Sequence, residues 1–168
     1  MQGWVLAEQG QVEEGIAKLR QGVAAFRAAG AERGLPYYLA LLAAAYAKAG
    51  RVEEGLAVQA EALDIVHRNG ERVIEAGLYV LKGWLLLARS GDNQAEAEGC
   101  FRHAIDIARR QSAKSSELRA VMSLSVLLQR QGKKEEARQM LAEIYGWFTE
   151  GFDTKDLQEA KALLEELT

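Results

Sequence analysis

A string of eight residues that occurs twice, nearly unchanged, constrains the fold of this chain more than any other feature. Residues 10–17 read GQVEEGIA, residues 50–57 read GRVEEGLA, and a degenerate third copy, GKKEEARQ, occupies residues 132–139. Gly10, Gly50, Gly91 and Gly132 are separated by 40, 41 and 41 residues. A fixed period of this length is typical of solenoids, in which each unit buries its apolar face only by stacking on the next. The sequence therefore predicts stacked repeats.

The composition favours helix throughout this repeat. The 168 residues include one proline, 7% aromatic residues and long stretches rich in Ala, Leu, Glu, Arg and Gln. These residue types lose little side-chain freedom in a helix. With 49% hydrophobic residues, the chain has enough apolar surface for a continuous core in one domain. We therefore expect an all-α, single-domain fold.

Each of the four glycines separates two stretches whose apolar residues recur at helical spacing, which predicts a helix-turn-helix unit. Glycine adopts the left-handed conformation that ends a helix without a Cβ penalty, and paired glutamates after the turn complement the dipole of the next helix. We expect helices over residues 1–9, 12–29, 36–49, 52–69, 73–90, 94–111, 115–131 and 134–149. The repeats would then span about 1–34, 35–71, 72–113 and 114–150, with a capping helix at about 154–167.

Small and large residues recur at fixed distances from the turn glycines, as close helix packing requires. Small residues are expected to let the paired helices approach at Gly3, Ala43 and Ser125, at Gly15, Gly55 and Ala137, and at Gly22 and Ala62. In the third repeat, which has one extra residue on each side of Gly91, the matching positions are Gly83, Leu86, Ala97, Phe101 and Ala104. Two residues depart from the pattern, Gln59 at a large apolar position and Ile144 at a small one.

The turn glycines and this packing pattern resemble the tetratricopeptide repeat family, in a version with long helices, over nearly the whole chain. The resemblance implies an α-solenoid of four helix-turn-helix repeats plus a C-terminal capping helix. Residues 145–157, YGWFTEGFDTKDL, and the closing helix resemble the tail of bacterial signalling proteins that join a nucleotide cyclase domain and a STAND-type ATPase to such repeats. This second resemblance implies a partner-binding or sensor arm.

The sequence does not predict an enzyme, a cofactor or a metal site. The glycines of residues 10–15 and 50–55 match half of a phosphate-binding loop, but no Lys-Ser/Thr pair follows either of them. Glu96, Cys100 and His103 lie on successive turns of one expected helix, yet no second Cys/His pair completes a set of ligands. No serine or cysteine stands beside an identifiable base. We expect a non-enzymatic protein.

Charge and cysteine content indicate the environment and the partners. The net charge of −3 and the absence of long basic runs disfavour binding to nucleic acid or anionic membranes. The longest uncharged run, residues 34–47, is shorter than a bilayer-spanning helix. A single cysteine and the lack of a secretory leader pattern favour the cytoplasm.

In the tetratricopeptide arrangement, the first helix of each pair lines a concave groove. The groove positions, transferred to this chain, give a hypothetical partner-binding set of Trp4, Tyr37, Lys48, Val80, Trp84, Leu87, Arg119, Met122 and Arg130. A clamp for a C-terminal carboxylate needs Lys, Asn and Arg side chains together, and the only candidates are Lys48, Arg119 and Arg130. We therefore do not expect this mode of recognition. The aromatic residues are expected to bind a helix or extended segment of another protein.

Three other interpretations stay open. The groove could instead hold a small-molecule or peptide effector, which would make the chain a sensor domain. Some of the aromatic residues could pack between adjacent helices and take no part in binding. The expected first helix is shorter than its counterparts, and we expect a homodimer through this N-terminal end or by exchange of N-terminal helices.

Overall fold

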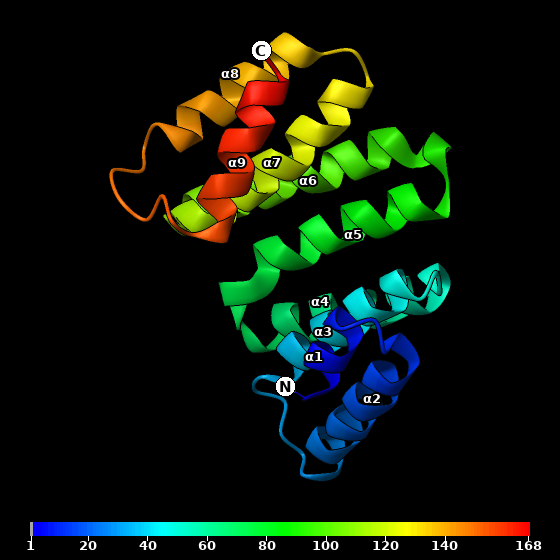
Figure 1. Cartoon of the computed structure of the whole chain (residues 1–168). Helices are drawn as coiled ribbons and strands as arrows, with labels where there is room; N and C mark the ends of the chain where they lie inside the picture. The colour runs from blue at the N-terminus through cyan, green and yellow to red at the C-terminus, as the bar shows by residue number, and fades with distance from the viewer. Residues whose placement is uncertain (1) are drawn as a thin grey trace.

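The structure is a computed structural model that describes residues 2–168 (Figure 1). These residues contain helices and turns but no strand, so the all-α prediction is confirmed. The α-helices are α1 (Gln2–Glu8), α2 (Val12–Ala28), α3 (Leu35–Lys48), α4 (Val52–Asn69), α5 (Glu75–Arg89), α6 (Gln94–Arg110), α7 (Lys114–Arg130), α8 (Lys134–Tyr145) and α9 (Lys155–Glu166). Two 3₁₀ turns, η1 (Arg72–Ile74) and η2 (Gly91–Asn93), precede α5 and α6.

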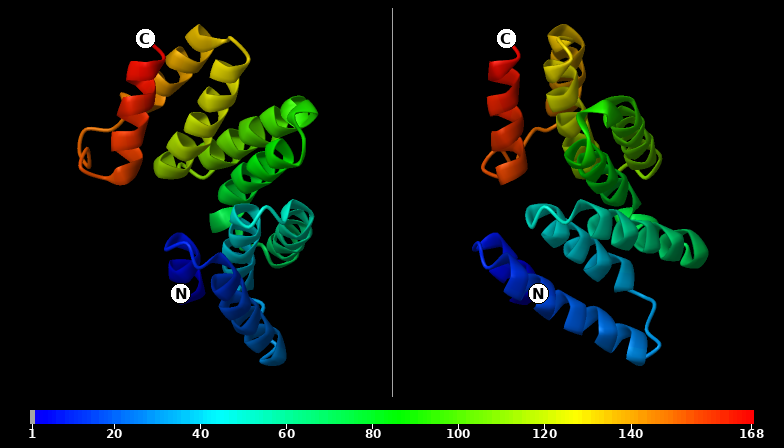
Figure 2. Two further views of the ribbon diagram at one scale, coloured as in Figure 1. Left: turned by 45° about the vertical axis from the view of Figure 1, so that its right-hand side comes forward. Right: turned by 90° about the vertical axis from the view of Figure 1, so that its right-hand side faces the viewer.

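The helices form antiparallel pairs that stack from the N-terminal pair at the bottom of Figure 1 to α8 and α9 at the top. Each first helix contacts the first helix of the next pair: α1 contacts α3, α3 contacts α5, and α5 contacts α7. The second helices of successive pairs make no comparable contacts within residues 2–168, and the turned views in Figure 2 show the pairs rotating along the stack. The first helices therefore line the inner side of a solenoid.

Helix α9 covers the C-terminal end of this stack, where it packs against α7 and α8. Its apolar stripe is buried at Leu157, Ala160 and Leu163, and Leu167, directly after the helix, is buried as well. The remaining sides carry charged residues, as expected for a helix that closes a repeat array. The predicted solenoid with a capping helix is therefore confirmed.

Three of the four repeat turns use glycine as predicted. Gly10, Gly50 and Gly132 have φ angles of 91°, 72° and 79°, in the left-handed region that a side chain rarely adopts. In each case the residue after the glycine donates a backbone hydrogen bond back into the last turn of the preceding helix. This is the geometry that ends a helix and starts an antiparallel one.

The third turn differs, so the prediction that Gly91 ends its helix in the same way is wrong. Helix α5 ends at Arg89. The next residue, Ser90, is extended (φ −159°, ψ 140°), and its hydroxyl accepts a hydrogen bond from the Asp92 amide. The Asn93 side chain donates to the carbonyl of Leu86 at 3.0 Å. Side-chain hydrogen bonds thus satisfy the helix end that glycine satisfies elsewhere.

The other expected helix boundaries lie within two residues of the observed ones, with one exception. Helix α8 ends at Tyr145 and not at residue 149. The Gly146 amide still bonds to Ala142, but the Trp147 amide bonds to Ile144, three residues back. This tighter bonding ends the α-helix and begins the aromatic loop of residues 146–154.

Several of the small residues lie where two helices approach closely. A Cβ atom on Gly15 would lie 2.5 Å from the carbonyl oxygen of Gly3, and one on Gly55 would lie 2.8 Å from a methyl carbon of Leu85. Gly22 is different because a Cβ atom there would meet nothing within 4 Å. Packing therefore requires glycine at Gly15, where the obstacle is backbone, and at Gly55 the missing side chain leaves the space that Leu85 occupies. The expectation that packing requires a small residue at Gly22 is wrong.

The apolar core consists of two clusters that meet at α5. One cluster joins α1–α4 with Leu78 of α5, and the other joins most of α5 with α6–α9. Buried Gln59 lies at the junction, where its side-chain amide donates to the Leu78 carbonyl at 3.1 Å. Next to Gln59, a cleft of about 610 Å³ opens between α4, α5 and α6. The expected continuous core is thus divided where a polar residue replaces a large apolar one.

The contact between Gly15 and Gly3 predicts opposite effects for two alanine substitutions in α2. Gly15→Ala should lower the free energy of unfolding by about 1–3 kcal/mol, because a backbone oxygen cannot move aside. Gly22→Ala, in the same helix, should raise it by up to about 1 kcal/mol, because alanine lowers the entropy lost on folding. Urea denaturation monitored by circular dichroism measures both values. Equal effects of the two substitutions would contradict the role of Gly15.

A buried carboxylate links the third and fourth repeats. The Glu117 side chain is 4% exposed and accepts hydrogen bonds from Arg109 Nε at 2.7 Å and Lys114 Nζ at 2.8 Å. Burial opposes ionisation of this carboxyl group, but the two charged donors outweigh it and hold the pKa of Glu117 below its ordinary value. The ionised form therefore stabilises the α6–α7 junction.

The lowered pKa predicts acid-dependent stability. Above the ordinary glutamate pKa of about 4.5 the contribution of Glu117 is complete, and it is lost as the pH falls through the lower folded-state pKa. Glu117→Gln should reduce the free energy of unfolding at pH 7 by about 1–3 kcal/mol and flatten its decline below pH about 4.5. Urea denaturation at a series of pH values tests this. The control, Glu135→Gln, removes an exposed ion pair with Arg138 and should change stability little at pH 7.

Candidate functional site

The inner surface formed by α1, α3, α5 and α7 carries large apolar side chains that the core does not cover. Each of these helices buries one side against its own pair and the next, which leaves the residues on the opposite side exposed. Trp4 on α1 is 40% exposed and Tyr37 on α3 is 45% exposed. Ala40 and Ala44, which follow Tyr37 on α3, are half-buried.

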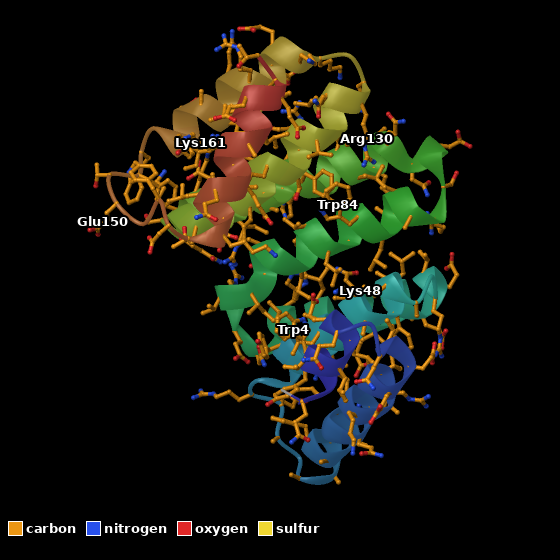
Figure 3. All side chains as sticks on the ribbon, viewed as in Figure 1. Trp4, Lys48, Trp84, Arg130, Glu150 and Lys161 are labelled. Atoms are coloured by element: carbon orange, nitrogen blue, oxygen red, sulfur yellow. The ribbon has the colours of Figure 1, made fainter. Side chains whose placement is uncertain are left out.

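Trp84 on α5 has a different environment. It is partly buried, its ring centroid lies 5.4 Å from that of Phe101, and its indole N–H donates to the Ser123 hydroxyl at 3.1 Å. Ser123 in turn donates to the backbone carbonyl of Arg119. Trp84 therefore holds α5 against α6 and α7, and only part of its ring remains available on the inner surface, where Figure 3 labels it.

The remaining apolar residues of the hypothesised groove line the same surface in the third and fourth repeats. Val80, Leu87 and Met122 are partly buried and pack against the C-terminal core cluster. Val80 and Leu87 lie one turn before and one turn after Trp84, so the three residues share one side of α5. The geometry suits contact with apolar side chains of another chain.

The three basic residues of the hypothesised groove lie in different surroundings. Lys48 Nζ lies 2.5 Å from the Glu8 carboxylate, and Arg119 Nε lies 2.7 Å from that of Asp156. Arg130 has no ion-pair partner within residues 2–168, and its guanidinium carbon lies 5.9 Å from the Trp84 ring centroid. Arg119 and Arg130 are eleven residues apart on α7, which is about 16 Å along a helix. The structure thus does not bring the three cations together.

The aromatic loop between α8 and α9 exposes a surface that lies outside the predicted groove. Trp147 and Phe152 are 58% and 46% exposed, and the Trp147 ring lies against Phe148. A cavity of about 590 Å³ lies beside this loop, lined in part by Arg119 and Phe148. The sequence signal for this surface was the density of aromatic residues in 145–152, because a loop of this length seldom buries so many aromatic side chains.

The residues considered for catalysis or metal binding have surroundings that suit a structural role. Burial raises the pKa of the Cys100 thiol above its ordinary value, which disfavours the reactive thiolate. The His103 ring packs edge-on against Tyr79, with centroids 4.4 Å apart. No group of three His, Cys, Asp or Glu side chains that could hold a metal ion occurs in the part of the chain from residue 2 onwards. Over the same residues, no helix is both long enough and apolar enough to cross a bilayer.

Comparison with known sequences identifies a repeat at the C-terminal end. The model of the tetratricopeptide repeat family matches residues 118–144, which belong to α7, α8 and the turn between them. An uncharacterized protein of Rhizobium meliloti (strain 1021) is 30% identical over 125 residues, or 74% of this chain. The aligned region is 12% of that relative, so this chain spans only a small part of its length.

Solved structures share the fold of the whole chain. Two structures of nearly identical TPR-like repeats from a Podosopora anserina kinesin light chain superpose with TM-scores of 0.73 and 0.70. Each covers 98% of this chain, and the matches cover 81% and 89% of those chains, at 18% and 19% identity. Tetratricopeptide repeats generally form non-enzymatic scaffolds that bind proteins or peptides. The chain is therefore a helical solenoid of the tetratricopeptide type, with a recognisable family repeat at residues 118–144.

Proposed function

We propose that this protein is a non-enzymatic scaffold that binds a helix or extended segment of another protein along its inner surface. The observation that carries the proposal is the exposure of Trp4 and Tyr37, at 40% and 45%, on the first helices of the solenoid. Large aromatic side chains contribute most of the free energy of binding at many protein interfaces.

The neighbouring surface supports the same function. Small residues, Ala40 and Ala44, follow Tyr37 on α3, while partly buried Val80 and Met122 continue the apolar surface on α5 and α7. Exposed aromatic anchors beside small residues allow side chains of a partner to enter and lose contact with water. The first helices present these positions in parallel, so one partner segment can cross several repeats.

Replacing the anchors tests this proposal. The probe is a set of peptides selected from a random twelve-residue display library on the immobilised full chain, with affinity measured by fluorescence anisotropy. Tyr37→Ser and Trp4→Ser should each weaken binding about tenfold or more, because each removes a buried aromatic contact.

The matched control is Val73→Ser, because Val73 is 82% exposed on the turn before α5 and lies outside the proposed surface. It should leave peptide affinity unchanged, and far-ultraviolet circular dichroism should show intact helices in all three variants. Failure to enrich any peptide, or equal affinity for the wild-type chain and both anchor variants, would refute the proposal.

We further propose that the scaffold serves as the partner-binding arm of a cytoplasmic bacterial signalling protein. Two observations support this context. Residues 145–167 resemble the tail of cyclase and STAND-type ATPase proteins that carry such repeats, and the Rhizobium meliloti relative is a much longer protein that aligns over 12% of its length.

We also propose that the chain forms a homodimer through α1. Val5 on this short helix is 43% exposed, and two copies can bury their Val5 side chains against each other across a two-fold axis. Multi-angle light scattering should therefore give the mass of a dimer at high micromolar concentration, and Val5→Glu should return the mass of a monomer. A wild-type monomer at that concentration would exclude the dimer.

A further inference from the structure

We infer that the inner surface selects a segment with a carboxylate next to a large apolar side chain, and that Arg130 on the face of Trp84 binds this carboxylate. The inference rests on the proposed function, because it names the chemistry of the segment that the same surface would bind. It concerns the fourth repeat, at a distance from the aromatic anchors of the first two.

In the first, second and fourth repeats a charged residue stands two residues before the turn glycine: Glu8, Lys48 and Arg130. In the third repeat, which has one extra residue before its turn, Arg89 lies one position beyond the equivalent site, close to the same end of its helix. Because the first helices run parallel, their C-terminal ends meet along one edge of the inner surface. Basic residues at this position also complement the negative end of the helix dipole, which is sufficient reason for their presence.

Ion pairing distinguishes Arg130 from the other basic residues of this edge. Lys48 pairs with Glu8 of the preceding first helix, and Arg89 lies 3.9 Å from the Glu96 carboxylate. Arg119, the other arginine of the hypothesised groove, pairs with Asp156 of the capping helix.

Arg130 has neither an ion-pair partner nor a side-chain hydrogen bond to any residue in the range 2–168. It is the groove cation that a ligand carboxylate can bind without displacing another acid.

The Trp84 ring holds the Arg130 guanidinium in a position from which it can bind a carboxylate. The guanidinium group lies over the indole ring, with 5.9 Å from its central carbon to the ring centroid. The indole is itself fixed by its hydrogen bond to Ser123 and by contact with Phe101. Figure 3 shows Trp84 and Arg130 on the neighbouring helices α5 and α7. A cation held on an aromatic face keeps its planar donors free for a carboxylate and loses less entropy on binding.

The surroundings of the pair define the rest of the segment. Met122 and Val126 precede Arg130 on α7 by two helical turns and one. Both side chains are partly buried, so part of their apolar surface stays exposed. A large apolar side chain of the ligand can cover these residues and the free part of Trp84. Such contact removes water from Arg130, which disfavours a neutral or basic segment that leaves the guanidinium unpaired. An acidic residue beside the apolar one satisfies both requirements.

The experiment selects peptides from the twelve-residue random library on three full-length proteins: wild type, Arg130→Glu and Arg119→Gln. Peptides selected on the wild type should be enriched in Asp and Glu next to large apolar residues. Charge reversal at Arg130 should replace this enrichment with Lys and Arg. Arg119→Gln is the matched control, because its cation is already paired, and it should retain the acidic enrichment.

A second measurement uses one selected acidic peptide and its analogue with Gln in place of the acid. The wild-type chain should bind the acidic peptide five- to twentyfold more tightly than the analogue, and Arg130→Gln should reduce this ratio to about one. The ratio should remain for Arg119→Gln. A thermal melt of each variant shows that the fold is retained.

The outcomes separate this inference from the proposed function. Enriched peptides that depend on Tyr37 but carry no acidic preference would overturn the inference alone, as would an acidic preference that survives Arg130→Glu. Failure to enrich any peptide would refute the proposed function and this inference together. Acidic enrichment that reverses with the charge of residue 130 is the result that supports it.

Discussion

The close approach of the two helices within each repeat is the constraint on which the rest of this structure depends. In the first pair the backbone oxygens of Gly3 and Gly15 lie so close to the opposite helix that neither position has room for a Cβ atom. In the second, Gly55 provides the space that Leu85 of the next repeat occupies. Each repeat buries its apolar face only against its neighbours. A change in the distance between the paired helices of one repeat would therefore shift every later helix.

Much of this architecture could be predicted because it follows from local rules that act within about forty residues. Glycines with positive φ, such as Gly50 and Gly132, end helices for a steric reason that the sequence displays directly. Buried Ala43, Ala62 and Ala97 likewise follow from their fixed distance to the turn. These features required no knowledge of which residues meet across repeats.

The features that could not be predicted are those in which one chemical group substitutes for another. Ser90 and Asn93 complete the third turn with side-chain hydrogen bonds in place of a left-handed glycine. Gln59 occupies a leucine position because the Leu78 carbonyl satisfies its amide. In the candidate site, the sequence placed Lys48 and Arg119 on the inner helices, but their ion pairs join residues 40 and 37 positions apart. Only the three-dimensional arrangement shows which cation lacks a partner.

The division of the core has a consequence for any partner that uses the whole inner surface. Tyr37 is carried by α3, which belongs to the N-terminal cluster, whereas Trp84 packs against the C-terminal cluster. The two clusters meet at α5, where buried Gln59 and the cleft of about 610 Å³ reduce apolar contact. A segment that contacts both aromatic residues therefore crosses this junction. A substitution at Gln59 that shifted α4 against α5 would change the spacing of Tyr37 and Trp84, and with it the affinity, without contacting the ligand.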